Sequence, residues 1–247
     1  MATRKGLFIG FLFCLLCHPL GAQNILLQTE NFLRIQQKKF NFGAKVGFNA
    51  TLPVVNSMRV LDFEANQFHT NYQVGYLAAI FFRFNIQRFY IQPSPSWHYG
   101  RSHLDFVLTF PEINGVTDPP IKGNLRMRTQ SLELPILLGY HLVKQGPYGL
   151  SLMVGPKVKY NYKLDYHMAI DYREVRFVND DTPFGVNIVS GMGVSIGRLF
   201  FDFVYEFGLN QTEASFKQLY SSSPESSFEI QINKRTNVMS MSIGMLF

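Results

Sequence analysis

Phe40–Leu52 reads FNFGAKVGFNATL, and apolar and polar residues alternate through it without a break. Successive side chains of a β-strand point to opposite faces, so a period of two predicts a strand with one apolar face. That face would carry Phe40, Phe42, Ala44, Val46, Phe48, Ala50 and Leu52. The opposite face would carry Asn, Gly, Lys and Thr side chains.

Seven later segments repeat this alternation before the chain ends on Phe247. The eight predicted strands are 40–52, 72–84, 89–99, 131–142, 148–164, 184–196, 199–209 and 236–247. Short connections join strands two and three, four and five, and six and seven, whereas the other four connections (53–71, 100–130, 165–183 and 210–235) are long. Pro93 and Pro95 weaken the third strand, but both lie in one phase, where a bulge would absorb them.

Strict sorting of short turns and long loops to opposite ends is typical of outer-membrane barrels, whose periplasmic turns are short. Predicted strands of about 11 to 17 residues also suit a tilted membrane crossing with overhang. Aromatic side chains gather near both ends of the strands, as at the two membrane interfaces. We therefore predict an all-β fold, a closed antiparallel eight-stranded transmembrane β-barrel. A soluble β-sandwich or lipocalin-like barrel is the alternative.

The first 22 residues have the features of a cleaved secretory signal. Arg4 and Lys5 precede an uncharged run from Gly6 to Cys17, and the small pair Gly21-Ala22 comes before Gln23. We predict a signal peptide over 1–22, a polar periplasmic arm over 23–39 and a barrel domain over 40–247. Lipidation at Cys17 is an alternative, although Leu16 stands where a small residue normally precedes a lipidated cysteine.

Charge and cysteine content exclude several classes of function. The chain has 23 basic and 17 acidic residues, so losing Arg4 and Lys5 leaves 21 − 17 = +4, too mild for a nucleic-acid-binding protein. Both cysteines lie in the leader. The histidines show no metal-ligand spacing, and no glycine-rich phosphate loop is present. We predict no cofactor and no metal site.

The inward face of the predicted barrel is rich in charge. An eight-stranded barrel is just wide enough for side chains to fill, so an open pore is not expected. A mutually satisfied salt-bridge network is predicted, because buried charges need partners. A narrow anion path along Lys157, Lys159 and Lys163 is the alternative. The predicted inward charged set is Lys45, Arg83, His98, Glu133, His141, Lys157, Lys159, Asp202 and Glu206.

A lipid-modifying enzyme is the alternative function from another class. Its nucleophile and base would come from Ser96, His98 and His103, with Glu133 or Glu206 as the orienting carboxylate. Ser96 and His98 share an inward face, but residues i and i+2 of a strand lie about 7 Å apart, too far for direct proton transfer. We therefore assign no catalytic residue.

Four stretches resemble the PorT-like family of outer-membrane β-barrel proteins from Bacteroidetes. They are the leader ending in GAQ, the first strand FNFGAKVGFNAT, the middle strand LELPILLGY and the later VGPKV. The resemblance implies an eight-stranded barrel, usually without an assigned activity, and no catalytic residues. The eponymous member is an accessory of the type IX secretion and gliding apparatus, which makes a secretion accessory a further alternative. The terminal Phe247 resembles the signal that the outer-membrane assembly machinery reads.

Together these features predict a monomeric, non-enzymatic protein of the outer membrane with a structural or interaction role through its long loops. The expected partners are outer-membrane lipid and lipopolysaccharide, and the assembly machinery through Phe247. A protein partner is expected at the loops or at the periplasmic arm, and no nucleic acid.

Overall fold

The computed structural model describes residues 38–60, 63–108, 119–145, 147–170, 173–179, 183–210, 212–218 and 229–247. The predicted signal peptide and all of the periplasmic arm except Lys38 and Lys39 lie outside these ranges. Among the described residues, no helix is long and apolar enough to cross a membrane. The strands are β1 (Phe40–Val60), β2 (Phe63–Tyr72), β3 (Val74–Ile86), β4 (Phe89–Pro93), β5 (Ser96–Leu108), β6 (Ile121–Gln145), β7 (Tyr148–Ile170), β8 (Arg173–Asn179), β9 (Phe184–Ile196), β10 (Leu199–Gly208), β11 (Thr212–Gln218) and β12 (Glu229–Leu246).

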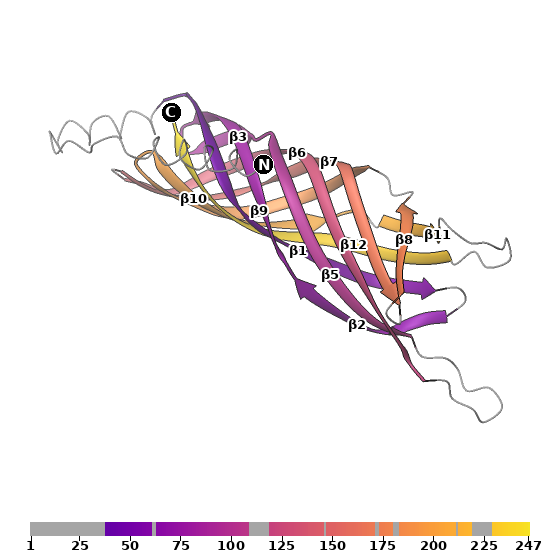
Figure 1. The fold of residues 1–247 in the computed structure, drawn as a ribbon. Helices are drawn as coiled ribbons and strands as arrows, with labels where there is room; N and C mark the ends of the chain where they lie inside the picture. Colours follow the sequence, from indigo (N-terminus) through magenta and orange to yellow (C-terminus); the bar gives the residue numbers. More distant parts are fainter. Residues whose placement is uncertain are drawn as a thin grey trace, which may run out of the picture.

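The strands close into an antiparallel barrel (Figure 1). β3 pairs with β1, β4 and β5 together take the next place, and β6, β7, β9, β10 and β12 follow in order. The ring closes where β12 pairs with β1, from Gly43 opposite Leu246 to Val60 opposite Ile230. Counting β4 and β5 as one, eight strands form the ring, which confirms the predicted fold class. Closure removes the free edges that an open sheet would expose.

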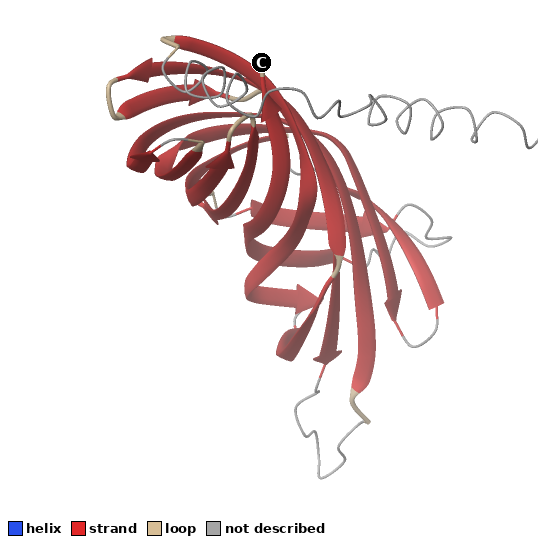
Figure 2. Cartoon of the chain, turned by 90° about the vertical axis from the view of Figure 1, so that its left-hand side faces the viewer, coloured by secondary structure: helices blue, strands red, loops and turns tan. Residues whose placement is uncertain are grey.

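Five of the eight barrel strands are much longer than the sequence pattern predicts, because β4 and β5 together also reach from Phe89 to Leu108. β1, β6, β7 and β12 have 21, 25, 23 and 18 residues. Their outer halves, with the short strands β2, β8 and β11, extend the sheet beyond the barrel into regions predicted to be loops (Figures 1 and 2). The prediction failed there because the alternation breaks down, as in PVVNSMRV of 53–60. Backbone pairing continues regardless, since it depends on the neighbouring strand and not on an apolar face.

The third predicted strand is interrupted, but it is not bulged. β4 ends at Pro93 and β5 begins at Ser96, yet Pro93 lies opposite Ile136 and Ser96 opposite Glu133, so the register on β6 is unchanged. The Ser94 amide donates to the Pro135 carbonyl (3.0 Å), which keeps the chain in line across the break. The prolines therefore remove ladder donors without moving any later side chain to the other face.

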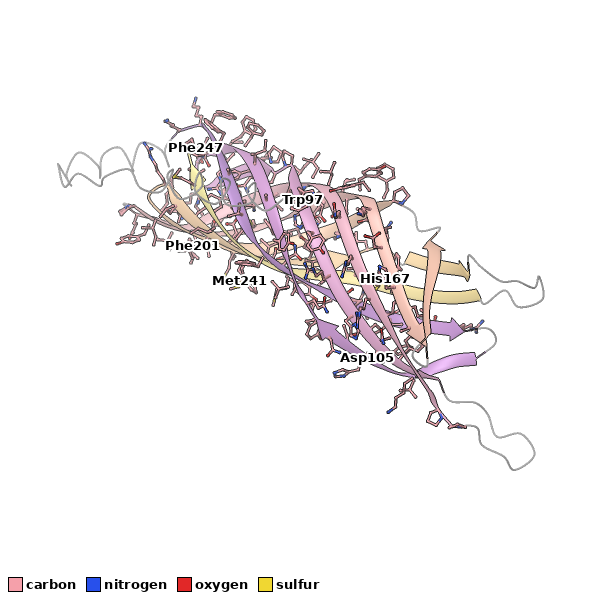
Figure 3. The ribbon with its side chains drawn as sticks, viewed as in Figure 1. Trp97, Asp105, His167, Phe201, Met241 and Phe247 are labelled. Carbon is pink, nitrogen blue, oxygen red and sulfur yellow. The ribbon has the colours of Figure 1, made fainter. Side chains whose placement is uncertain are left out.

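The outside of the barrel is apolar, as the alternation predicts. On β1, β3, β7, β10 and β12 the outward residues of the middle section are exposed hydrophobic side chains, among them Phe48, Ile80, Val154, Phe201 and Met241. A soluble fold would bury this face. A band of this kind bounded by aromatic residues suits the hydrocarbon core of a membrane. Phe247 and Phe201 lie toward the end with the tight turns, and Asp105 and His167 toward the loop end (Figure 3).

Aromatic side chains close the turn end of the barrel from inside. The rings of Phe81 and Phe200 meet edge to face with centroids 5.1 Å apart, and both pack with Leu246 in the core.

Each of four buried aromatic rings lies against a glycine directly opposite on the neighbouring strand. The pairs are Phe81 with Gly43, Tyr90 with Gly139, Phe106 with Gly123 and Phe200 with Gly244. The missing Cβ leaves room for each ring to lie flat on the sheet.

Replacing Gly139 with valine is expected to lower the free energy of unfolding by about 1–3 kcal/mol, because the new side chain would overlap the buried Tyr90 ring. Gly185→Val is the matched control, since a Cβ at that inward position meets no atom within 4 Å. Denaturant titration of both variants folded into lipid vesicles measures the difference. Equal losses at the two glycines would contradict the packing role of the Tyr90 and Gly139 pair.

Candidate functional site: the charged barrel interior

Charged side chains from four strands meet at mid-height inside the barrel. Glu133 comes from β6, Lys157 from β7, Glu206 from β10 and His98 from β5. Each occupies an inward position of the two-residue alternation, and the closed ring brings strands far apart in the sequence to a common axis. We call Glu133, Lys157 and Glu206 the central triad; the side chain of each is at most 4% exposed.

Lys157 holds the two carboxylates of the central triad together. Its Nζ lies 2.5 Å from Oε2 of Glu133 and also donates to Glu206. Glu133 has further partners: the Ser131 hydroxyl donates to its Oε1 (2.8 Å), and Nε2 of His98 lies 3.3 Å from its Oε2. Nζ of Lys159 is 3.7 Å from Glu133 Oε1. Burial of these charges is tolerated because each has a partner of opposite charge or a hydrogen bond.

Two further groups fill the barrel nearer the turn end. Nζ of Lys45 lies 3.0 Å from Oδ2 of Asp202. Arg83 donates from Nε to Oε1 of Gln92 (2.7 Å), and its guanidinium carbon lies 4.5 Å from the centre of the Tyr90 ring. A planar guanidinium can stack on an aromatic face while it donates in its own plane. The central triad and the Lys45–Asp202 pair confirm the predicted network of paired inward charges, whereas Arg83 is satisfied by Gln92 and Tyr90. His141 is half-buried against Tyr90, with ring centres 4.9 Å apart.

The prediction that Lys163 faces inward in line with Lys157 and Lys159 is wrong. The register of β6 and β7 shifts so that Ser131 pairs with Asn161 and Gln130 with Lys163. The extra residue, Tyr162, reverses the facing of everything beyond it. The Lys163 side chain is 55% exposed and lies 3.8 Å from Asp165. Because Lys157 and Lys159 both contact Glu133, the interior offers no row of uncompensated cations along β7.

The catalytic arrangement considered from the sequence does not assemble. Ser96 and His98 do face inward on β5, but the Ser96 hydroxyl donates to the backbone carbonyl of Glu133 (3.2 Å). His103 lies on the other face of β5, where its Nε2 is 3.0 Å from Oδ1 of Asp105. The imidazole of His98 contacts Glu133 instead of a hydroxyl. A nucleophile needs a base within about 3.2 Å, and Ser96 contacts neither histidine.

His98, Glu133 and Glu206 also form a group that could in principle hold a metal ion. One ligand atom from each lies within 4.8 Å of the other two. The Lys157 ammonium donates to both carboxylates and so supplies the positive charge that an ion would supply. The group therefore has the composition of an ion-pair cluster around a lysine. Histidine and glutamate spacing along the chain could not reveal it, because the three residues come from three strands.

A small polar cavity of about 90 Å³ lies between the central triad and the loop end. Its lining includes Asn49, Ser131, Lys159, Asn161 and Lys234. Lys234 was missed from the sequence because 210–235 was predicted as a loop. Its Nζ contacts the Tyr166 hydroxyl (3.0 Å) and Sδ of Met127 (3.3 Å) inside the extended barrel. Lys234 lies an even number of residues before Ser240 and Ser242, which face inward. The same alternation, extended toward the start of β12, would therefore have predicted that Lys234 faces inward.

A comparison with models of protein families agrees with this architecture. The family model described as "Outer membrane protein beta-barrel domain" matches residues 23–213. No curated protein sequence matches the chain. Among solved structures, OprG from Pseudomonas aeruginosa is 11% identical with a TM-score of 0.49, covering 85% of this chain and 97% of its own. Neisserial surface protein A is 9% identical (TM-score 0.35, covering 85% and 98%). The outer membrane protease OmpT from Escherichia coli is 9% identical (TM-score 0.39, covering 86% and 100%). Identities and scores this low carry no argument about activity.

Proposed function

The chain belongs to the outer-membrane protein β-barrel domain family and is an outer-membrane protein, and from that premise we propose that it is a closed, non-conducting barrel whose role is structural or one of interaction. It acts through the strands and loops that extend beyond the membrane. We further propose that the protein is a member of the PorT-like family of Bacteroidetes, which its sequence resembles. We also propose that a protein partner binds at the loops or at the periplasmic arm. In the same proposal, the outer-membrane assembly machinery recognises the terminal Phe247.

The filled interior is the observation that carries this proposal. Phe81, Phe200 and Leu246 occupy the turn end, and the central triad spans the middle, where its buried charges satisfy one another. Two cavities remain among the described residues, one of about 90 Å³ on the loop side of the central triad and one of about 30 Å³ on its turn side. Each is large enough for ordered waters, and the central triad lies between them. By contrast, β2, β8 and β11 extend the outer part of the sheet beyond the barrel (Figure 1), and this extension is the part of the protein offered to partners.

Conductance tests the closed state directly. The folded protein, recognised by its heat-modifiable mobility on a gel, is expected to give no steady current steps when inserted in a planar lipid bilayer. A general porin inserted under the same conditions is the positive control. Discrete current steps from the folded fraction that disappear after boiling would contradict the proposal.

A strain lacking the gene separates the other two functions. Unchanged lipid composition of its outer membrane is expected, since Ser96 donates to a backbone carbonyl and lacks a basic partner. A change in lipid acylation that the Ser96→Ala variant fails to restore would favour the lipid-modifying enzyme instead. Retention of secreted cargo in the periplasm of the same strain would identify the role as that of a secretion accessory.

A further inference from the structure

Basic side chains gather on one side of the barrel wall, just outside the aromatic belt at the loop end. Arg101 on β5, Arg126 and Arg128 on β6, and Lys163 on β7 all lie on the outer face of the sheet. We call these four residues the basic rim. Arg126, Arg128 and Lys163 are exposed and Arg101 is half-exposed. Three adjacent strands therefore present one continuous basic surface.

Hydrogen-bonded aromatic residues mark the membrane interface beneath this surface. The Trp97 indole donates to the Tyr162 hydroxyl (2.7 Å), which in turn donates to Oε1 of Gln130 (2.8 Å). Tyr76 and Tyr99 stack beside them, with ring centres 4.9 Å apart. Trp and Tyr side chains combine an apolar ring with a polar N–H or O–H group, and they are enriched at the level of the lipid headgroups. Trp97 in Figure 3 therefore locates this level, and Asp105 and His167 lie beyond it.

The basic rim follows the aromatic belt within one or two outward positions. Arg101 comes two residues after Tyr99, and Lys163 directly follows Tyr162. At about 3.3 Å per strand residue, the Cα atoms of Arg101 and Lys163 lie roughly 3 to 7 Å beyond those of Tyr99 and Tyr162 along their strands. Phosphate groups of outer-leaflet lipids lie at this height. Nζ of Lys144 and the side chain of Arg88 lie at the opposite, turn end of the barrel.

The arrangement of the basic rim is unfavourable without an anion. Arg101 lies directly opposite Arg128 across the β5–β6 pair, and like charges in that position repel each other. Asp165 lies opposite Arg128 on the other side, but its carboxylate contacts Lys163 at 3.8 Å. Asp105 is bound by His103 (3.0 Å) and Asn71 (2.8 Å). Among the described residues, neither Arg126 nor Arg128 forms an ion pair.

Arg101 is also held in position for a ligand. Its Nε donates to the Tyr99 hydroxyl (3.0 Å), and its guanidinium carbon lies 4.9 Å from the centre of that ring. The guanidinium also hydrogen-bonds to the Tyr76 side chain, which holds it beside the aromatic belt. Of its five N–H donors, those not bound to Tyr99 and Tyr76 remain for a ligand. Arginine recognises phosphate by paired donors of this kind.

We propose that the basic rim binds the phosphate groups of a phosphorylated glycolipid of the outer leaflet, with Arg101 and Arg128 sharing one phosphate. The bridging phosphate removes the repulsion between the two guanidinium groups, and Arg126 and Lys163 contact neighbouring anionic groups. The acyl chains lie against the apolar wall below, beside Trp97 and Leu132. This inference rests on the outer-membrane location and not on the proposed interaction role.

Binding of diphosphoryl lipid A to the full-length protein in neutral detergent tests the proposal. Each basic residue near a membrane surface contributes about a fivefold change in affinity, so R101Q/R128Q is expected to bind about 30-fold more weakly. The matched control is R88Q/K144Q, which removes the same charge at the turn end and is expected to bind as the wild type does. Heat-modifiable mobility of both variants confirms that each is folded.

Three outcomes would overturn the proposal. Equal weakening in both double variants would mean that net charge alone attracts the lipid. Equal affinity of the wild type for dephosphorylated lipid A would exclude phosphate recognition. Displacement of bound lipid A by millimolar inorganic phosphate would identify a site for free phosphate, not for a lipid headgroup. Retained binding in buffer with inorganic phosphate, together with loss only in R101Q/R128Q, supports the basic rim as a glycolipid site.

Discussion

Lys157→Met is expected to lower the free energy of unfolding by about 3–5 kcal/mol, the usual cost of removing one partner from a buried ion pair. The Lys157 side chain is 2% exposed and contacts both Glu133 and Glu206. Glu133 would keep His98, Lys159 and Ser131 as partners. Glu206 would be left as a buried carboxylate without its lysine, and this stranded charge accounts for most of the expected loss. Denaturant titration in lipid vesicles measures it.

Two further variants test the explanation. Lys163→Met removes the same charge from an exposed position on the same strand, and a loss below about 1 kcal/mol is expected there. Adding Glu206→Gln to Lys157→Met should recover part of the stability, because the stranded carboxylate is then neutral. A double variant as unstable as the sum of its two single variants would show that the central triad is not energetically coupled.

Val154→Arg is expected to cost about 2–4 kcal/mol, the range for an arginine near the midplane of a barrel's lipid face. Val154 is 50% exposed on β7, and it lies opposite Leu138 on one side and Ser190 on the other. An arginine there must bring its charge into hydrocarbon or carry water with it. Denaturant titration in vesicles again gives the free energy of unfolding.

The control for Val154→Arg must also point outward. Ser151, on the opposite face of β7, is unsuitable because its hydroxyl is packed between Tyr90 and the Gly193 carbonyl, each at 3.3 Å. His167→Arg is preferable, since His167 is exposed on the outer face of β7 beyond the aromatic belt. A small cost is expected there. Equal costs at the two positions would mean that Val154 does not face lipid.

Much of the barrel could be predicted from local alternation. Strands β9 and β10 begin at the predicted residues, and the tight turn at Gly197 and Arg198 was placed correctly. Strand ends toward the loops were predicted too short, as at Leu52 of β1, because pairing outside the membrane needs no apolar face. The phosphate site was not predicted, because its four residues lie in segments assigned to a loop or to the barrel interior.

Local alternation was enough to predict the facing of the side chains from Tyr148 to Asn161 of β7, before the bulge at Tyr162, because the strand period of two is a property of each segment. It also determined the number of strands in the ring. The pairing of the inward charges depends on the folded barrel, since Glu133, Lys157 and Glu206 meet through closure of strands distant in sequence. The bulge that turns Lys163 outward was likewise decided by pairing, because register depends on the neighbouring strand and not on the segment alone.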